Sequence, residues 1–403
     1  MKDGDLLRVL LISFSYPPVL GGLQTVTHTL ARQLLTQGHA VQVVTNRYPR
    51  SLPHSEKLDS VSVERLLFLW PELDYLRKHR MDLFLASWFY GPTTLLRLVR
   101  LLRSFCPDVV NVHFPDAQTP YVLWLRRRFD FRLVVSLHGD EVLRWGKDEG
   151  RTTEDERRRT KDERGLGQLR AVLREADAVT ACSGYLLGRA VELEVSIAGK
   201  GHVIHNGVDV ERFRNSTPYQ RARPYIFAYG RFTHKKGFDL LLQAFSQLTA
   251  DVPPVDLILA GDGEERASLE KQAQHLGLAD RVFFYGRAQP QEIVRLLNGS
   301  LFVVVPSREE PFGIVALEAL AAGKPVLATR VGGLPEILSS LDGRGAALAH
   351  PTVGGLAQGL GQWLERRDEL SAWGEENQQR AAQFMWERMV EKYLRVYSPG
   401  DVL

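Results

Sequence analysis

Two glutamates at a fixed spacing give the clearest indication of chemistry in this chain. Glu310 and Glu318 stand eight residues apart in Ser307–Thr329, SREEPFGIVALEALAAGKPVLAT. If the stretch between them is mostly helical, they are at most about 12 Å apart along the axis, from a rise of about 1.5 Å per residue. Carboxylates accept hydrogen bonds from sugar and ribose hydroxyls, and a helix N-terminus between them suits a phosphate. The spacing therefore fits a nucleotide joined through its diphosphate to a sugar.

The apolar surroundings of Glu318 favour this interpretation. Its neighbours along the predicted helix are Ile314, Val315, Leu317, Ala319, Leu320 and Ala321. A carboxylate in a helix that is apolar on most faces is costly unless it meets a partner or a ligand. The alternative is that Glu310 is a loop charge and Glu318 a surface position.

A cluster of cations follows the first strand predicted in the second half of the chain, in Tyr229–Phe238, YGRFTHKKGF. Arg231 offers a planar fork, and Lys236 a point charge beside a glycine that lets a ligand come close. Together they could neutralise a diphosphate, and Lys235 is an alternative to Lys236. A solvated basic turn is the structural reading, but ligands of open α/β sheets bind at the carboxyl ends of strands, where this turn is expected.

In the first half of the chain, two histidines stand at the carboxyl ends of predicted strands. His138 belongs to Leu137–Glu141, LHGDE, and His113 ends DVVNVH. A histidine in such a place can contact a ligand, or it can be buried or cap a turn, and the residues alone leave both readings open. Asp116 and Asp140 are similarly undecided.

A glycine pair, Gly21-Gly22, lies in Pro17–Gln24, PPVLGGLQ, where the first predicted strand meets the first helix. It could form part of a phosphate-binding loop or simply a tight turn. Because the G-x-G-x-x-G spacing is incomplete, a dinucleotide site is not expected.

Short apolar runs alternate with amphipathic segments along the whole chain, which predicts parallel sheets covered by helices. In the first half, the predicted strands are Arg8–Phe14, Ala40–Thr45, Asp108–His113, Leu133–His138, Ala178–Ser183 and His202–His205. In the second half they are Tyr225–Tyr229, Val255–Ala260, Arg281–Tyr285, Leu301–Val305 and Pro325–Thr329. We therefore expect an α/β fold of two Rossmann-like domains with a cleft between them, and a mostly helical tail from Val353.

Five motifs in the second half, in the expected order, resemble the retaining glycosyltransferases of family 4, also called glycosyl transferases group 1. They are the two blocks above together with Ile204–Asp209 (IHNGVD), Leu259–Glu265 (LAGDGEE) and Val331–Leu338 (VGGLPEIL). The resemblance is specific over 203–338, with an E-x7-E pair, a GR-x4-KG block and a G-D-G turn. It is looser over 1–202.

This resemblance implies a GT-B fold with domains at 1–206 (acceptor side) and 207–383 (donor side), and a C-terminal helix, 384–403, that packs back on the first domain. It implies a metal-independent enzyme that moves a sugar from a nucleoside-diphosphate sugar to a hydroxyl of a glycan or lipid-linked acceptor, with retention of configuration. By analogy, the pathway is microbial polysaccharide, lipopolysaccharide or glycolipid synthesis. No cofactor is expected. The alternatives are a GT-B epimerase or phosphorylase, and a non-catalytic nucleotide-sugar-binding protein.

The resemblance also assigns roles to single residues. It implies that His138 and Glu310 are catalytic residues that face the donor sugar. The matching donor-binding residues are Arg231 and Lys236 for the diphosphate, Glu318 for the ribose, Phe312, Gly313 and Ile314 for backbone contacts, and Gly22 near the donor phosphates.

Composition narrows the possible partners. The 403 residues carry 51 basic and 48 acidic side chains, a net charge of +3, which is too weak to indicate nucleic acid as the main partner. Two cysteines cannot form a disulfide framework, so a reducing compartment is expected. The start of the chain has acids where a signal peptide needs a basic region, and no run of about 18 apolar residues could span a bilayer. A cytoplasmic protein is expected, and its oligomeric state is open.

Two charged segments lie outside these motifs. Leu95–Arg103, LLRLVRLLR, places three arginines within about 120° on a helix among six Leu and Val, so it could rest on an anionic membrane surface or simply face the core with a solvated basic side. Arg144–Arg164 is densely and evenly charged, which predicts a solvated helix or a loop. A lid or a docking role is the alternative.

No metal site is expected from the sequence. Neither cysteine lies in a C-x-x-C, and no His, Cys and carboxylate cluster has the spacing of zinc ligands. Asp3-Gly4-Asp5 matches D-x-D only formally, because it precedes the first strand.

Overall fold

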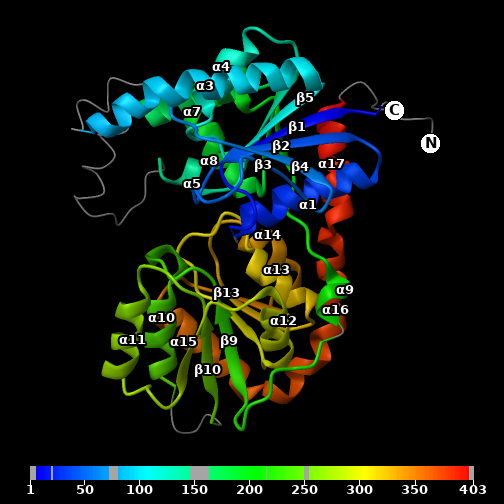
Figure 1. The fold of residues 1–403 in the computed structure, drawn as a ribbon. Coiled ribbons are helices and arrows are strands. Elements are labelled where there is room, and N and C mark those ends of the chain that lie inside the picture. The colour runs from blue at the N-terminus through cyan, green and yellow to red at the C-terminus, as the bar shows by residue number, and fades with distance from the viewer. Residues whose placement is uncertain are drawn as a thin grey trace. The chain divides into compact units, whose positions relative to one another are not determined.

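The computed structural model describes residues 6–19, 21–71, 80–145, 163–214 and 216–248, and then 254–398. The formal D-x-D match at Asp3–Asp5 and most of the charged segment, residues 146–162, lie outside these ranges. The chain forms two units, Met1–Ile204 with Met389–Leu403, and His205–Arg388 (Figure 1). Each unit is built around its own largely parallel sheet, which confirms the predicted α/β class.

The first unit contains an eight-stranded sheet in the order β3-β4-β2-β1-β5-β6-β7-β8. Its strands are β1 (Arg8–Ser13), β2 (Ala40–Asn46), β3 (Ser55–Leu58), β4 (Val61–Leu66), β5 (Val109–His113), β6 (Arg132–Leu137), β7 (Ala178–Ala181) and β8 (Gly201–Val203). Its helices are α1 (Gly22–Thr36), α3 (Met81–Phe105), α4 (Thr119–Arg126), α5 (Asp140–Leu143), α7 (Glu163–Glu175) and α8 (Gly184–Leu193), with a 3₁₀ turn, η1 (Val195–Ile197). Only β3 is antiparallel to its neighbour.

The β3–β4 hairpin was not expected, since no strand was predicted between Thr45 and Asp108. Its strands contain charged residues, and in β4 the apolar Val61 and Val63 alternate with polar neighbours. Such alternation is typical of a strand near the edge of a sheet, whereas the prediction relied on continuous apolar runs. The sequence-based prediction also missed the short edge strand of the second unit, β14 (Ala346–Ala349).

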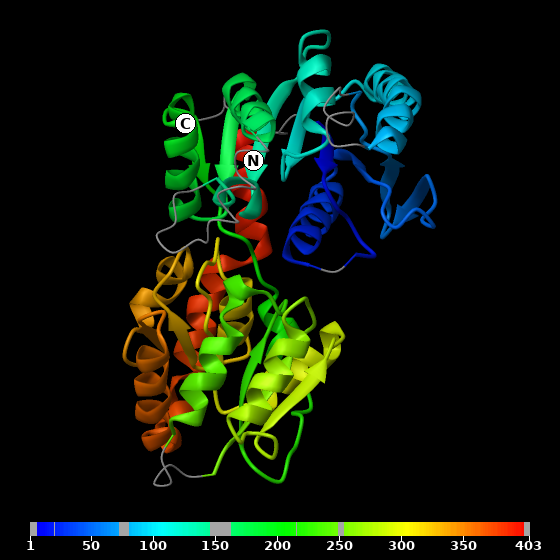
Figure 2. The same ribbon diagram turned by 90° about the vertical axis from the view of Figure 1, so that its left-hand side faces the viewer.

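The second unit contains a six-stranded parallel sheet in the order β11-β10-β9-β12-β13-β14. The other strands are β9 (Tyr225–Tyr229), β10 (Asp256–Ala260), β11 (Val282–Gly286), β12 (Val303–Val305) and β13 (Val326–Thr329). Helices flank this sheet on both sides (Figure 2): α9 (Val210–Arg214), α10 (Phe238–Ser246), α11 (Arg266–His275), α12 (Pro290–Gly299), α13 (Ile314–Ala321), α14 (Leu334–Leu338), α15 (Val353–Glu365) and α16 (Gly374–Ala381). Four 3₁₀ turns complete it: η2 (His234–Lys236), η3 (Ser339–Leu341), η4 (Arg367–Trp373) and η5 (Ala382–Phe384).

Alternate residues of β9 face opposite sides of this sheet. Ile226 and Ala228 belong to a buried apolar cluster with residues of α10 and α15. On the other side, the Tyr225 hydroxyl donates to the carbonyl of Leu296 on α12 at 2.7 Å, and Tyr229 reaches α13. The period of two is why one short strand can anchor helices on both faces and still present its last residue to a site.

The last helix, α17 (Trp386–Tyr397), begins in the second unit, and its residues from Met389 onward belong to the first. Its tyrosines bond to polar side chains of the first sheet: Asn111 donates to the Tyr397 hydroxyl at 2.7 Å, and the Tyr393 hydroxyl donates to Ser136 at 3.4 Å. Thr180 also donates to Ser136, at 2.8 Å. A buried polar network thus fixes α17 on this sheet.

Removing one hydroxyl from this network should destabilise the first unit. In Tyr397→Phe, the buried amide of Asn111 loses its acceptor, which costs about 1–3 kcal/mol. Urea unfolding should therefore show a lower free energy of unfolding for this variant. The matched control, Tyr48→Phe, changes a side chain that is 73% exposed and should stay within about 0.5 kcal/mol of the unchanged chain. Equal stability of the two variants would contradict the role of the network.

Candidate functional site

The strand order of the second sheet reverses direction between β9 and β12, with β10 and β11 to one side and β13 and β14 to the other. Ligands of open α/β sheets bind outside the carboxyl ends of the strands at such a reversal. The loop after β9 contains Arg231 and Lys236, and the loop after β12 contains Glu310. The fold therefore brings the predicted cations and the first predicted glutamate to the same edge.

These two loops are bound to each other. The backbone N–H groups of Arg308 and Glu309 donate to the carbonyl of Lys235, at 2.8 and 3.2 Å. The Arg308 guanidinium also donates to both carboxylate oxygens of Asp239, at 2.6 Å each. Paired bonds of this kind fix direction as well as distance, so the turn that carries Lys236 has a defined position against the loop that carries Glu310.

Lys236 and Glu310 form an ion pair. The Lys236 ammonium donates to Glu310 Oε2 at 2.6 Å, and the Ser307 hydroxyl donates to the same oxygen at 3.1 Å. Glu310 is buried, and Lys236 is about half-buried. Sequence reasoning assigned these residues to a diphosphate and to a sugar separately, and did not expect that they contact each other. An ammonium has three protons, so one bond to Glu310 leaves two for a ligand.

The backbone of Glu310 is held by the VGG segment. The N–H of Gly333 donates to the Glu310 carbonyl at 3.0 Å. Gly332 has a φ of +56°, and a Cβ built on it would lie 1.8 Å from the same carbonyl oxygen. Only glycine allows this approach, which explains why the motif belongs with the glutamate block.

The predicted residues 312–314 form the entrance to α13. Phe312 is buried against the His205 ring, with centroids 5.7 Å apart. Gly313 has a φ of +113°, and a Cβ on it would lie 2.6 Å from Leu334 Cδ2. The helix itself begins at Ile314, later than the predicted Gly313, so only its first turn, residues 314–317, lies between the two glutamates. The first backbone N–H groups of α13 have no acceptor within the helix, and they are available to an anion.

Glu318 meets a partner that the sequence reasoning did not name. The Tyr229 hydroxyl, at the end of β9, donates to Glu318 Oε2. Burial raises the pKa of Glu318, whereas the bond from Tyr229 and the nearby Arg212 lower it. Burial and the same carboxylate hold the pKa of Tyr229 well above its ordinary value. Tyr229 was already part of the quoted YGRF block, so a search for polar strand-end residues facing α13 could have found it.

Arg231 differs from the other cations of this edge. It is exposed, and its side chain has no hydrogen-bond or ion-pair partner among the described residues, whereas Lys235 donates to Glu309 at 2.6 Å and Lys236 pairs with Glu310. A guanidinium that is free of internal partners can bind an anion without breaking an existing bond.

In the first unit, the strand order reverses between β1 and β5, and His138 follows β6, the next strand. His138 Nε2 lies 3.0 Å from His113 Nδ1, and the two rings are stacked with centroids 5.2 Å apart. Burial lowers the pKa of His138 to about 4 and the pKa of His113 well below its ordinary value. Both imidazoles are therefore neutral near pH 7. Gly22, the other predicted residue of this unit, is exposed as the first residue of α1.

Glu141 fixes the loop that carries His138. Its carboxylate accepts the backbone N–H groups of His138 and of Gly139, the latter at 3.0 Å. Burial raises the pKa of Glu141 to about 7, although these bonds oppose the shift. Glu141 was quoted in LHGDE but not assigned a role.

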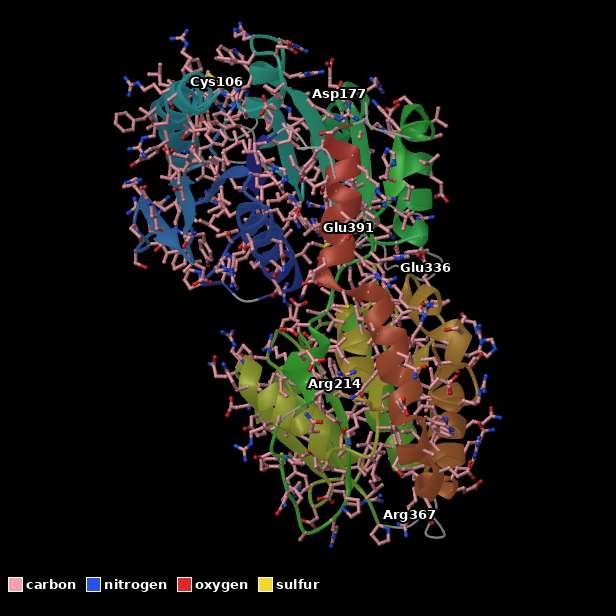
Figure 3. The ribbon with its side chains drawn as sticks, turned by 90° about the vertical axis from the view of Figure 1, so that its right-hand side faces the viewer. Cys106, Asp177, Arg214, Glu336, Arg367 and Glu391 are labelled. Atoms are coloured by element: carbon pink, nitrogen blue, oxygen red, sulfur yellow. The ribbon has the colours of Figure 1, made fainter. Side chains whose placement is uncertain are left out.

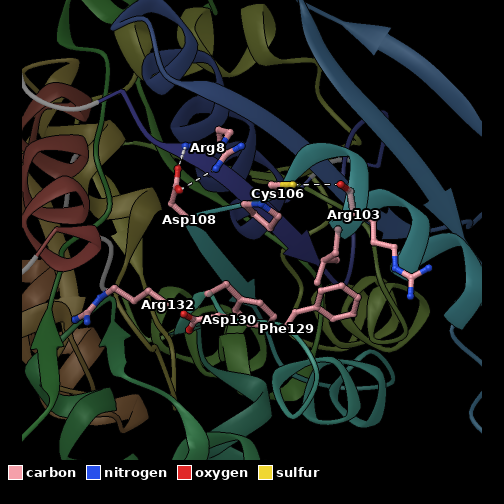
Figure 4. A pocket seen from close by; sticks show the side chains of 10 residues that line it. Arg8, Arg103, Cys106, Asp108, Phe129, Asp130 and Arg132 are labelled. Carbon is pink, nitrogen blue, oxygen red and sulfur yellow. Dashed lines mark hydrogen bonds and ion pairs between the residues drawn. The ribbon is translucent and has the colours of Figure 1, made fainter.

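The hollow shown in Figure 4 lies at the opposite edge of the first sheet, where β1, β5 and β6 begin. Arg8 donates to Asp108 there, and Arg132 donates to the Val396 carbonyl at 2.8 Å. None of the predicted site residues lines it. In the described parts of the chain, no three His, Cys, Asp or Glu residues are grouped so that they could hold a metal ion.

Two family descriptions match the chain: "Glycosyltransferase Family 4" over residues 20–212 and "Glycosyl transferases group 1" over residues 209–380. The glycogen synthase of Mycobacterium tuberculosis is 29% identical over 97% of this chain and 94% of its own length. Sucrose-phosphate synthase from Thermosynechococcus elongatus matches in structure with a TM-score of 0.77 at 22% identity, over 97% of this chain and 98% of that one. Anabaena HepE in complex with UDP and glucose gives a TM-score of 0.75 at 19% identity, over 98% and 100%.

The chain therefore belongs to the glycosyltransferases of family 4, as its motifs predicted, and has the GT-B fold. It is a glycosyltransferase that uses a nucleotide sugar. The alternatives of an epimerase, a phosphorylase or a non-catalytic binding protein are not supported.

The contact between Tyr229 and Glu318 can be tested by titration. A hydroxyl that donates to a carboxylate stabilises its charged form, so Tyr229→Phe should raise the pKa of Glu318 further above its ordinary value. NMR titration of the ¹³C-labelled glutamate side chains measures this pKa. In the control, Tyr285→Phe, the lost hydroxyl donates to Glu292 at 2.9 Å, and Glu318 should not respond. An unchanged pKa of Glu318 in Tyr229→Phe would refute the contact.

Proposed function

We propose that this glycosyltransferase moves a sugar from a nucleoside-diphosphate sugar to a hydroxyl of a glycan or lipid-linked acceptor, with retention of anomeric configuration. The observation that carries the proposal is the grouping of Arg231, the Lys236–Glu310 pair and the N-terminus of α13 at the reversal point of the second sheet. A diphosphate needs cations and free N–H groups, and a sugar needs a carboxylate beside them. Family membership and the UDP and glucose bound in the structure of Anabaena HepE agree with this assignment.

Arg231 and Lys236 bind the diphosphate. When the bond to the sugar breaks, negative charge grows on the leaving phosphate, and both cations and the dipole of α13 stabilise it without rearranging. The ion pair with Glu310 holds Lys236 in place before substrate arrives, so less entropy is lost on binding.

Glu310 binds the donor sugar through its hydroxyls, and Glu318 binds the ribose. Glu310 Oε2 already accepts from Lys236 and Ser307, so Oε1 is the atom offered to a sugar hydroxyl. His138 is the second residue proposed to hold the sugar. Phe312, Gly313 and Ile314 present backbone groups to the donor, and Gly22 is assigned to the donor phosphates.

Charge stabilisation by these cations makes a metal unnecessary, so transfer should continue in EDTA. We place the enzyme in the cytoplasm at the inner face of a membrane, in the synthesis of a microbial polysaccharide, lipopolysaccharide or glycolipid. None of the described helices is long and apolar enough to cross a bilayer. The membrane part of the proposal depends on α3.

The exposed side of α3 changes in character along the helix. Met81, Leu85, Trp88, Phe89 and Leu96 are exposed by 54–68%. Arg97, Arg100 and Arg103 follow on the exposed side, whereas Leu98, Leu101 and Leu102 are buried. The expected membrane segment, Leu95–Arg103, thus provides the charges but few of the apolar contacts, because three of its five leucines are buried. An aromatic end followed by a basic end fits the interface of an anionic bilayer.

Arg231 offers the direct test of the donor site. In Arg231→Ala, nucleoside diphosphate should bind about 10–100-fold more weakly, since a charge-assisted bond contributes about 1.5–3 kcal/mol, and the nucleoside should bind almost unchanged. Isothermal titration measures both affinities. The control is Arg367→Ala, an exposed arginine on η4 labelled in Figure 3. Equal losses for nucleoside and diphosphate would overturn the phosphate contact. In Glu310→Gln, sugar transfer measured in the presence of EDTA should be lost, whereas nucleotide should still bind. The unchanged chain should transfer sugar under the same conditions.

Co-sedimentation of the full chain with vesicles tests the membrane surface. We expect binding to phosphatidylglycerol-containing vesicles that weakens with salt, and a loss of about tenfold in Trp88→Ser, since an exposed aromatic side chain gains about 1.5–3 kcal/mol on burial. The control, Val195→Ser, changes an apolar side chain that is 77% exposed on η1. Failure to bind any vesicle, or dimerisation that Trp88→Ser abolishes, would refute a lipid partner.

A further inference from the structure

The histidine pair of the first unit leaves one nitrogen without a partner. His113 is fully buried; its Nδ1 contacts His138 Nε2 at 3.0 Å, and its Nε2 has no hydrogen-bond partner among the described residues. The ring cannot turn easily, because it stacks on His138 and lies 6.0 Å from the Tyr393 ring of α17. The positions of the two rings therefore limit which nitrogen of each imidazole can carry the proton.

Two arrangements are possible for two neutral imidazoles, since each has one N–H. If His138 Nε2–H donates, His113 must hold its own proton on Nε2, and a buried N–H is left without an acceptor. If His113 Nδ1–H donates, the nitrogen without a partner is a lone pair, and the proton of His138 lies on Nδ1. Buried N–H groups without acceptors are rarer in proteins than acceptors without donors. The second arrangement is the favoured one.

We infer that His113 is a positioning residue that holds His138 in its Nδ1-protonated tautomer, so that His138 presents an N–H donor to a ligand. No described residue bonds to His138 Nδ1, and the side chain is partly exposed. The ligand atom that it recognises is then an oxygen lone pair of a hydroxyl or phosphate. This inference rests on the proposed function for the identity of that ligand, but the tautomer itself does not depend on it.

The tautomer restricts what His138 can do in the reaction. Its Nε2 lone pair is occupied by His113, and its Nδ1 already has a proton, so neither nitrogen can remove a proton from an acceptor hydroxyl. His138 orients a sugar or phosphate oxygen by donating a hydrogen bond to it. Deprotonation of the acceptor hydroxyl then requires another group. An oxygen of the leaving phosphate can take this proton.

Substitutions of His113 separate this role from simple packing. Asn has an amide N–H close to the position of histidine Nδ1–H and can preserve the bond to His138. Leu fills similar space but cannot donate. The tautomer of His138 should persist in His113→Asn and change in His113→Leu.

The decisive experiment is ¹⁵N NMR of the full chain labelled in its histidines, without ligand, near pH 7. The signals of His138, assigned by loss in His138→Gln, should show a protonated Nδ1 in the unchanged chain and in His113→Asn. They should lose that pattern in His113→Leu. An Nε2-protonated His138 in the unchanged chain, or no response to His113→Leu, would overturn the inference.

A kinetic measurement then links the tautomer to the proposed reaction. The value of kcat/KM for sugar transfer should fall about tenfold in His113→Leu, as for the loss of one hydrogen bond, and stay within about threefold in His113→Asn. Equal losses in both variants would assign His113 to packing alone. If no sugar were transferred by any form, the proposed function would fail while the NMR result would still decide the tautomer. If His113→Leu did not fold, the unchanged chain and His113→Asn would still test it.

Discussion

The ion pair between Lys236 and Glu310 is the contact on which the arrangement of the second unit depends. It joins the loops that follow β9 and β12, the two neighbouring strands at which the sheet reverses its order. A nearly buried carboxylate without a partner would be costly, so the lysine turn must stay beside it. The bonds between Arg308 and Asp239 and the close approach of Gly332 maintain the same geometry from outside. The ion pair, the backbone contacts and the strand order therefore all fix Lys236 and Glu310 beside each other.

The first unit contains a row of buried polar residues that crosses an otherwise apolar sheet. Ser13, Thr45, Arg65, His113, Ser136 and Thr180 are register partners from strand to strand, and all are buried. Most buried polar groups in proteins are hydrogen-bonded, and here the Tyr393 hydroxyl of α17 bonds to Ser136 and Thr180 at one end of the row. The histidine pair lies beside that end. The Tyr393 ring of α17 lies 6.0 Å from the His113 ring, so this helix limits how the ring can turn.

Much of this could be predicted from the sequence, and the reasons are local. Val-rich runs separated by amphipathic segments indicate parallel strands wherever both faces are covered, and the glutamate and lysine blocks are short, continuous motifs. The β3–β4 hairpin escaped prediction because an edge strand alternates and contains charges. The partners Tyr229 and His113 could be read as strand ends, but their contacts with Glu318 and His138 depend on which strands are neighbours. Sheet order is a property of the whole chain, and no single motif encodes it.

The helix α17 has a consequence for the synthesis of the protein. Residues 208 and 385 pair in an isolated bridge, so the chain enters and leaves the second unit at the same place. The second unit is in effect an insertion, and the first unit is completed only by residues 389–397. On the ribosome, the first sheet must wait with Asn111 and Ser136 uncovered until the second unit and then residues 389–397 have been made. The second unit can already be folding when the first one closes, which reverses the usual order from N-terminus to C-terminus.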